Sequence, residues 1–346
     1  MNTPELKLTM LGTTGSGKTM FLLGMYDILS TGLHGYFVFT EDPDQGADLR
    51  DTWDELVEKG RLPQGTGVDR SIAYRFVFNH GFTPLIGVDW LDYRGGAVGG
   101  RTRDGEDVGL LRQRLAESDS IYLVLDGGKI AGWLDGTDSL PAVQRALKVN
   151  DLSTSVQQAV AQRRASGLPM PSLAVLITKA DLLARQDRRL GDALATVVKN
   201  LDTMLPVVWN PGVTTFICPV KVGNFGTSTT GTGVVDAGAI DPVSLHRPMI
   251  FSLAHYLTEG LGARETRMTS ATARNSVVQG QLADLNQGFM SFFRGRKIAE
   301  LRALSDTYER EQEEARQKQH ADQDLITMLG REIQGHPIIR DGKLEM

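Results

Sequence analysis

The segment GTTGSGKT, residues 12–19, limits what this chain can fold into more than any other feature. It follows an apolar stretch, Leu6 to Leu11, and precedes a helical pattern, so it satisfies GxxxxGK[ST] between a strand and a helix. Glycines in such a loop let the backbone wrap a phosphate chain, with amide N–H groups and a helix N-terminus turned toward the negative charge. The sequence therefore predicts a phosphate-binding loop in an α/β domain.

The loop residues have separate expected roles. Lys18 is expected to reach the β and γ phosphates, and Thr19 to supply a hydroxyl to Mg²⁺, which bridges the same oxygens. Both are also catalytic candidates, because hydrolysis takes place at the γ-phosphate. A chance glycine-rich turn is the alternative. The residues expected to bind the nucleotide here are Gly12, Thr14, Gly15, Ser16, Gly17, Lys18 and Thr19.

Apolar runs bounded by turn residues alternate with helical patterns over the first two thirds of the chain, as in a mainly parallel sheet. We therefore expect an α/β fold of the P-loop type, with that sheet flanked by helices. The expected strands are 6–11, 36–40, 72–78, 85–91, 120–125, 173–178 and 214–218, and the expected helices are 18–30, 44–59, 105–117, 141–165, 181–205 and 244–260.

From about residue 264 the composition shifts to Arg, Glu, Gln and Ala, with Leu or Ile at helical spacing. We divide the chain into a P-loop domain, 1–263, and a helical C-terminal extension, 264–346, which is partly solvated and contacts a partner. Within the extension, FMSFFRGRK (289–297) combines aromatic and cationic residues. Packing on the domain or on a partner is its expected role, and contact with an anionic membrane surface is the alternative.

Composition restricts the class of protein. The 346 residues carry 37 Lys and Arg against 42 Asp and Glu, and the net charge of −5 gives no general attraction to nucleic acid. Cys218, the single cysteine, cannot form an internal disulfide and suits a reducing compartment. We expect no signal peptide and no transmembrane segment, because no sufficiently long apolar run occurs. These features favour a cytoplasmic protein.

A second motif lies at the end of a predicted strand. PLIGVDWLDYRGG contains Asp92-Tyr93-Arg94-Gly95, a DxxG pattern. A carboxylate at Asp92 can hold the metal through water, and the amide of Gly95 can sense the γ-phosphate. Asp89 falls on the opposite face of the strand, because side chains alternate with a period of two, and is expected to be structural.

The third motif follows the apolar run SLAVLIT and reads Thr178-Lys179-Ala180-Asp181, a [NT]KxD element. Asp181 can accept hydrogen bonds from N1 and N2 of guanine, a paired donor edge that adenine lacks. The stem of Lys179 can lie over the base plane. The motif favours GTP and GDP over ATP, with Thr178 also in the site. An ordinary acidic residue in a helical first turn is the alternative.

The next strand, TTFIC, runs into Pro219-Val220-Lys221. This turn falls where a backbone amide can read guanine O6, and we expect that of Val220 to do so, with Lys221 beside it. In this order, GTTGSGKT, DYRG, TKAD and the PVK turn resemble the G1, G3, G4 and G5 elements of the TRAFAC-class GTPases over roughly residues 5–260. TGSGKTMFLLGMYDILS, DWLDYRGG and LHRPMIFSL further resemble bacterial GTPases of the double-GTPase type.

The resemblance implies a Mg²⁺-dependent GTP switch with a protein partner, either a second GTPase or a GTPase-associated protein, in a presumed conflict or defence system. It also implies that the region at about 32–70 is an elaborated switch I, because the interval before DxxG is longer than in compact GTPases. Thr66 is the expected Mg²⁺-binding threonine of that region. Thr40 is the alternative.

The position after DxxG, where many relatives carry a glutamine that orients the attacking water, is Gly96. Glycine has no side chain to position water, so we expect slow hydrolysis. Arg94, Arg101 and Arg103 are candidates for an arginine that neutralises charge on the transferring phosphoryl group, in cis or in trans. Solvated arginines are the plainer reading. A scaffold that binds GTP without useful hydrolysis, and a P-loop ATPase, are the rival hypotheses.

Overall fold

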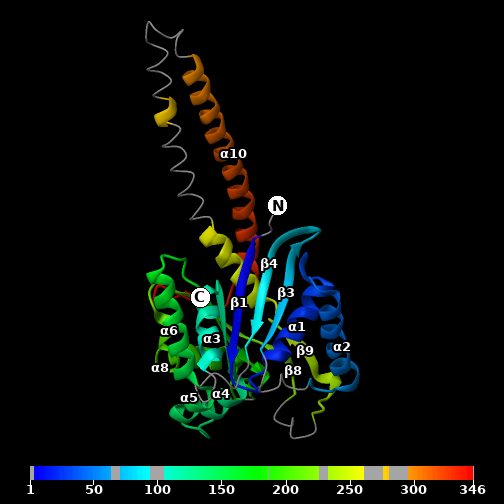
Figure 1. The fold of residues 1–346 in the computed structure, drawn as a ribbon. Coiled ribbons are helices and arrows are strands. Elements are labelled where there is room, and N and C mark those ends of the chain that lie inside the picture. The colour runs from blue at the N-terminus through cyan, green and yellow to red at the C-terminus, as the bar shows by residue number, and fades with distance from the viewer. Residues whose placement is uncertain are drawn as a thin grey trace. The chain divides into compact units, whose positions relative to one another are not determined.

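The computed structural model describes residues 4–63, 71–93, 105–185, 187–225, 233–260, 276–279 and 295–345 (Figure 1). Its contacts divide the chain into two compact units. The first unit combines Met1–Ser252 with Ile333–Met346, and the second is Leu253–Glu332. The candidate site lies wholly in the first unit.

The described part of the first unit contains a nine-stranded sheet in the order β11-β10-β7-β6-β5-β1-β4-β3-β2, and β8 pairs with β9 in a separate ribbon. The five central strands, β4, β1, β5, β6 and β7, are parallel, whereas the outer strands are antiparallel. The fold is therefore α/β with a mixed, centrally parallel sheet, as the sequence predicts. The strands are β1 Glu5–Gly12, β2 Tyr36–Thr40, β3 Ile72–His80, β4 Thr83–Asp92, β5 Ser120–Asp126, β6 Ser172–Thr178, β7 Thr214–Pro219, β8 Lys221–Gly223, β9 Ile240–Val243, β10 Ile338–Arg340 and β11 Lys343–Glu345.

Helices cover both faces of the sheet (Figure 1). On β5, Ile121, Leu123 and Leu125 are buried in a core that includes residues of α3, α5 and α6. Tyr122 points the other way, and its ring lies 6.2 Å from that of Phe21 on α1. The helices are α1 Lys18–Thr31, α2 Pro43–Lys59, α3 Gly105–Glu117, α4 Gly127–Leu134, α5 Leu140–Leu147, α6 Val149–Ala165, η1 Ala180–Leu182, α7 Leu190–Lys199, α8 Leu201–Met204, η2 Pro206–Trp209, η3 Ala237–Ala239, a helix over 247–260, and α10 Gly295–Glu332.

The main differences from the expected helices occur where single residues break the backbone. The helix predicted over 141–165 is two helices, because Lys148 between α5 and α6 adopts a left-handed φ of 53°. The region 181–205 is likewise a 3-10 turn followed by α7 and α8. Helix α4 was not predicted. It begins directly after β5, where Asp126 caps it by accepting a hydrogen bond from the Gly128 amide.

The last residues of the chain differ from the expected helical extension at 264–346, because they form two strands of the first unit. After α10 the chain returns to the first unit, where β10 pairs antiparallel with β7 and Ile339 is fully buried in the core. Asp341 and Gly342 both have positive φ, and an Asp-Gly pair with this geometry is the preferred two-residue hairpin turn. The strands β10 and β11 therefore form a hairpin, and only the segment before Ile333 belongs to the helical unit.

The second unit is dominated by α10, which has 38 residues and is therefore about 57 Å long at 1.5 Å per residue. Within this unit Gln279 donates a hydrogen bond to Ser305 Oγ at 2.7 Å. Among the described residues, no helix is both long and apolar enough to cross a bilayer. The cluster 289–297 lies largely outside the described residues.

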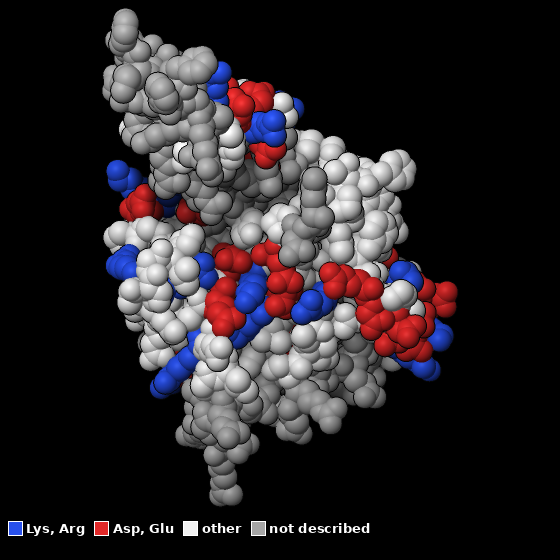
Figure 2. Space-filling view, turned by 45° about the horizontal axis from the view of Figure 1, so that its top comes forward, with Lys and Arg blue, Asp and Glu red and all other residues white. Residues whose placement is uncertain are grey.

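Charged side chains are unevenly spread over the surface (Figure 2). Helix α2 carries a dense acidic face, and its exposed carboxylates are Asp44, Asp48, Asp51, Asp54, Glu55 and Glu58. Such a face repels a phosphate backbone.

Candidate functional site

The loop after β1 has the backbone geometry that an anion site requires. Gly15 and Gly17 have φ values of 76° and 86°, a region that other residues rarely adopt. A Cβ on Gly12 would meet the Val124 carbonyl oxygen at 2.8 Å, so the loop packs directly against β5. Helix α1 begins at Lys18, and no side chain caps its N-terminus. Its first amide groups are therefore available to an anion.

Several buried polar atoms around this loop have no hydrogen-bond partner in the described part of the structure. They are Thr13 Oγ1, Ser16 Oγ and both carboxylate oxygens of Asp92. Buried polar groups are normally paired, because an unpaired one costs about 1–3 kcal/mol. Their gathering at one loop is the arrangement expected of a site whose ligands complete the hydrogen bonding.

Lys18 and Asp92 are both buried and influence one another electrostatically. Burial lowers the pKa of Lys18, and the negative charge of Asp92 acts in the opposite direction. Burial raises the pKa of Asp92 to about 6 despite the opposing effect of Lys18. The Lys18 ammonium donates to the carbonyl oxygens of Gly12, at 3.1 Å, and Thr13, at 3.4 Å. It is thus folded back onto the loop that it is expected to serve.

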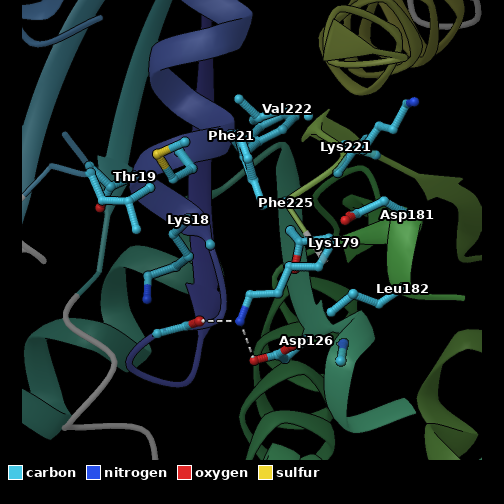
Figure 3. Close-up of a pocket in the computed structure, with 18 of the residues that line it drawn as sticks. Lys18, Thr19, Phe21, Asp126, Lys179, Asp181, Leu182, Lys221, Val222 and Phe225 are labelled. Carbon is cyan, nitrogen blue, oxygen red and sulfur yellow. Dashed lines mark hydrogen bonds and ion pairs between the residues drawn. The ribbon is translucent and has the colours of Figure 1, made fainter. Parts of the chain in front are cut away.

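A cavity of about 640 Å³ joins this loop to the third motif (Figure 3). Because β1, β5 and β6 are parallel neighbours, their carboxyl ends meet at one edge of the sheet, where ligands of open α/β sheets bind. Asp92, Gly12 and Ser16 do not line the cavity. The predicted residues that do are Thr14, Gly15, Gly17, Lys18, Thr19, Thr178, Lys179, Asp181, Val220 and Lys221.

The TKAD segment is tied to the phosphate loop by side-chain hydrogen bonds. Thr178 Oγ1 donates to the Ser16 carbonyl oxygen at 2.6 Å. The Lys179 ammonium donates to the carbonyl oxygen of Gly15 at 3.1 Å and to Asp126 Oδ2 at 2.8 Å. Asp181 lies in η1 with its carboxylate turned toward the cavity (Figure 3). The structure therefore brings two motifs, separated by some 160 residues, into one site.

The expected role of the Val220 amide is wrong. This residue lines the cavity, but its N–H donates to the Ile177 carbonyl oxygen at 2.9 Å and so continues the backbone pairing of β6 with the β7 end. An amide already paired in this way does not read a base. The neighbouring Lys221 turns its ammonium to Asp241 Oδ2 at 2.7 Å and Asn224 Oδ1 at 3.0 Å.

The cavity also has an apolar wall that the sequence motifs did not predict. Its members are Met20, Phe21, Leu62, Pro63, Leu182, Val222, Phe225 and Leu245. Two distant segments are joined beside it: the Leu62 amide donates to the Gly233 carbonyl oxygen at 2.8 Å, and the Val235 amide donates to that of Gly60 at 2.7 Å. We call residues 60–62 and 233–235, paired in this way, the clasp. The clasp connects the later part of the expected switch I region to the chain beyond β8.

Several predicted residues lie outside the described residues, namely Thr66, Arg94, Gly95, Gly96, Arg101 and Arg103. Thr40, the alternative to Thr66, ends β2 and pairs with Phe76, and it does not line the cavity. Among the described residues, no group of three or more His, Cys, Asp or Glu side chains is placed to hold a metal ion. Mg²⁺ bound to a nucleotide needs only one or two protein ligands, however, because phosphates and water complete its shell.

Neither a protein-family model nor a curated protein matches the chain. Among solved structures, a crystal structure of a mutation variant of SsGBP matches 63% of this chain at 13% identity, with a TM-score of 0.28. The chain spans about half of that protein, 49% of its length. The conserved domain of the dynein light intermediate chain matches 63% of this chain and 69% of its own at 13% identity, with a TM-score of 0.26. At TM-scores this low, neither likeness says what this chain does.

Proposed function

We propose that this protein binds a guanine nucleotide together with Mg²⁺ and acts as a slowly hydrolysing, partner-regulated GTP switch. One observation carries the proposal: a phosphate loop with unpaired buried polar atoms shares a single cavity with the Lys179 and Asp181 side chains of TKAD. A phosphate loop alone suits any nucleoside triphosphate, whereas the added carboxylate suits a base with two adjacent N–H donors.

At the phosphate end, the loop amides and the N-terminus of α1 bind the phosphate chain, and Lys18 swings from the loop carbonyls to the phosphate oxygens. The unpaired oxygens of Asp92 and the hydroxyl of Thr19 suit a hard cation. These two residues would hold Mg²⁺, which neutralises charge on the β and γ phosphates. Thr66 is the further ligand proposed from switch I.

At the base end, Asp181 accepts the N1 and N2 hydrogens of guanine, and the methylene stem of Lys179 covers one face of the base. Phe225 and Leu62 supply apolar surface to the nucleoside. Thr178 keeps this end in place through its hydrogen bond to Ser16.

Hydrolysis proceeds by in-line attack of water on the γ-phosphate. A bond forms from the water oxygen to phosphorus, the bond to the β–γ bridging oxygen breaks, and GDP and phosphate leave. Gly95 senses the γ-phosphate, and Arg94 is the first candidate to neutralise the transferring charge. Gly96 offers no side chain to orient the water, which makes the reaction slow. The same feature favours the second candidate function, a GTP-gated scaffold without useful turnover.

The resemblance to double-GTPase proteins motivates the partner, a second GTPase or a GTPase-associated protein, and a role in bacterial defence. Its setting would be the cytoplasm. No nucleic acid is proposed as a ligand, and peripheral membrane contact is not required.

The test is nucleotide affinity on purified, nucleotide-stripped protein, comparing GTP, GDP and ATP with Mg²⁺ by calorimetry. We expect both guanine nucleotides to bind at least about 100-fold more tightly than ATP, as for a site built on base-edge hydrogen bonds. Equal or tighter ATP binding would overturn the guanine assignment and favour a P-loop ATPase. Phosphate release over several turnovers then separates the two candidate functions, because the scaffold releases none with or without the partner.

A further inference from the structure

We propose that Asp126 is a positioning residue of this site, which holds Lys179 across the base end of the cavity and thereby sets the affinity for the nucleoside. The inference rests on the proposed function, since it adds a residue to the same site. Asp126 is not part of any of the sequence motifs. It ends β5 directly beside the end of β6, in register with Thr178.

Both oxygens of the Asp126 carboxylate are engaged. Oδ1 accepts a hydrogen bond from the Gly128 amide at 2.9 Å and caps α4, and Oδ2 accepts one from the Lys179 ammonium at 2.8 Å (Figure 3). The same ammonium reaches the Gly15 carbonyl oxygen at 3.1 Å. One lysine nitrogen thus ties the end of β5 to the phosphate loop.

Burial distinguishes this pair from an ordinary surface ion pair. The Asp126 side chain is 9% exposed and that of Lys179 is 41% exposed. Exposed pairs contribute little, since water screens them and both side chains must be ordered. Here the carboxylate is already fixed because it caps α4, so the entropy cost of ordering falls mainly on the lysine side chain. A buried carboxylate also needs a cation beside it.

The backbone leaves this arrangement little freedom. Lys179 has a φ of 51°, a left-handed conformation that non-glycine residues rarely adopt and that is typical of functional sites. A Cβ on Gly127 would lie 2.2 Å from the Thr178 carbonyl oxygen, so the turn after Asp126 is in direct contact with the segment that carries Lys179. The backbone segments that carry the carboxylate and the lysine are therefore held close together.

Holding the Lys179 ammonium in place also restricts the methylene groups of the same side chain. With its nitrogen held between β5 and the phosphate loop, the Lys179 side chain is drawn along the cavity wall, where the flat face of a base can lie on its methylene groups. Without Asp126 the nitrogen keeps only the Gly15 contact, and the stem is free to adopt other rotamers. Removing the Asp126 carboxylate therefore weakens the recognition of the nucleoside and leaves the phosphate loop intact.

A double-mutant cycle tests this role. We expect Asp126→Asn to bind GTP and GDP roughly ten-fold more weakly than wild type, as for loss of one charge-assisted hydrogen bond. In a Lys179→Met background the same substitution should change affinity less than about two-fold, because the residue acts through the lysine. Competition by inorganic tripolyphosphate should be unchanged by Asp126→Asn. A merely structural role would instead weaken every ligand, whether or not Lys179 is present.

Two controls complete the design. Asp236→Asn changes an aspartate that caps η3 in the same way, through the Gly238 amide at 2.9 Å, but lies outside the cavity, and it should leave affinity unchanged. If Asp126→Asn lowers the melting temperature sharply, Asp126→Ser is the second variant, because serine also caps a helix and lacks both the charge and the amide group of asparagine. Suppose that wild type binds GTP selectively, but that Asp126→Asn leaves the affinity unchanged or its effect simply adds to that of Lys179→Met. That result would overturn the positioning role alone. Absence of GTP binding by wild type would overturn the proposed function as well.

Discussion

The two ends of the cavity are built in different ways. The proposed phosphate end is lined by nearly consecutive residues between Thr14 and Thr19. Behind this lining, buried polar atoms of Thr13, Ser16 and, at the end of β4, Asp92 have no hydrogen-bond partner in the described residues. At the base end the polar groups are already paired, as Lys179 is with Asp126 and Lys221 with Asp241. The apolar remainder of that end comes from segments far apart in the chain.

The difference bears on how each end recognises a ligand. Groups that lack partners gain hydrogen bonds on binding at little cost in reorganisation, so under the proposed function we expect the phosphate end to supply affinity. Groups that are paired beforehand exchange one partner for another or hold their neighbours in place, so we expect the base end to supply discrimination. The four predictions that follow test this division, beginning with the largest effect.

Lys18→Ala should have the largest effect. Removing the cation at the phosphate end should weaken GTP and GDP by about 100-fold or more, since it removes hydrogen bonds between charged groups at a buried site. Lys129→Ala is the matched control, because Lys129 lines the same cavity but donates to the Ala146 carbonyl oxygen. Calorimetry measures the nucleotide affinity of both variants. Equal losses of affinity would show that the cavity needs positive charge but not Lys18 in particular.

Asp181→Asn should change which base is bound. We expect GTP to bind roughly 30-fold more weakly and xanthosine triphosphate to bind more tightly, because the donor and acceptor at this contact are exchanged. Asp138→Asn changes another carboxylate of the cavity and should leave the base preference unaltered. If Asp181→Asn instead weakened the binding of all nucleotides equally, Asp181 would not be the residue that distinguishes the bases.

Asp92→Asn should stabilise the nucleotide-free, metal-free protein at neutral pH. Because the folded pKa of Asp92 is about 6 against an ordinary 3.8, the folded carboxyl keeps its proton longer than the unfolded one, and stability falls as the pH rises from about 4 to about 6. The variant lacks this loss and should be about 3 kcal/mol more stable at pH 7.5, with no difference below pH about 4. The pKa of His246, lowered by burial to about 4, gives the opposite slope but is present in both proteins and cancels.

Thermal melts of the two proteins across pH 4 to 8 measure this difference. Adding Mg²⁺ and GTP should reverse the order at neutral pH, because the ionised carboxylate then has the cation it lacks in the free protein. A difference between wild type and Asp92→Asn that does not change with pH would contradict the assignment.

Phe225→Ala should have the smallest effect. Loss of one aromatic side chain from the apolar wall should weaken nucleotides about five-fold, and guanine and adenine nucleotides alike, since packing on a ring does not read the base edge. Phe82→Ala is the control, because Phe82 is fully exposed at the turn between β3 and β4. Displacement of a fluorescent nucleotide resolves five-fold changes. A loss confined to guanine nucleotides would assign Phe225 to discrimination after all.

The loop at residues 12–19 and the TKAD segment could be picked out from the sequence, because each is encoded in consecutive residues that follow a strand. Asp126 and Phe225 were not predicted, because their place in the site depends on which strands become neighbours. A weak signal for Asp126 did exist, since it ends a buried strand of a parallel sheet, where ligand contacts gather. The prediction for the Val220 amide was wrong because this amide, just past the end of β7, still pairs with the Ile177 carbonyl oxygen of β6. No local sequence pattern shows such pairing. The Asp341-Gly342 turn was readable in the sequence but lay in a segment whose composition suggested helix.

The strand β10 also bears on when the first unit can form. During synthesis β7 emerges early, but its edge partner and the buried Ile339 follow only after the whole of Leu253–Glu332 has been made. Until then the edge of the sheet next to β7 lacks its last neighbours, and the core lacks a side chain. The unit that carries the site therefore reaches its final state after the helical unit has left the ribosome, so a protein that binds the helical unit has access to the nascent chain before the sheet is complete.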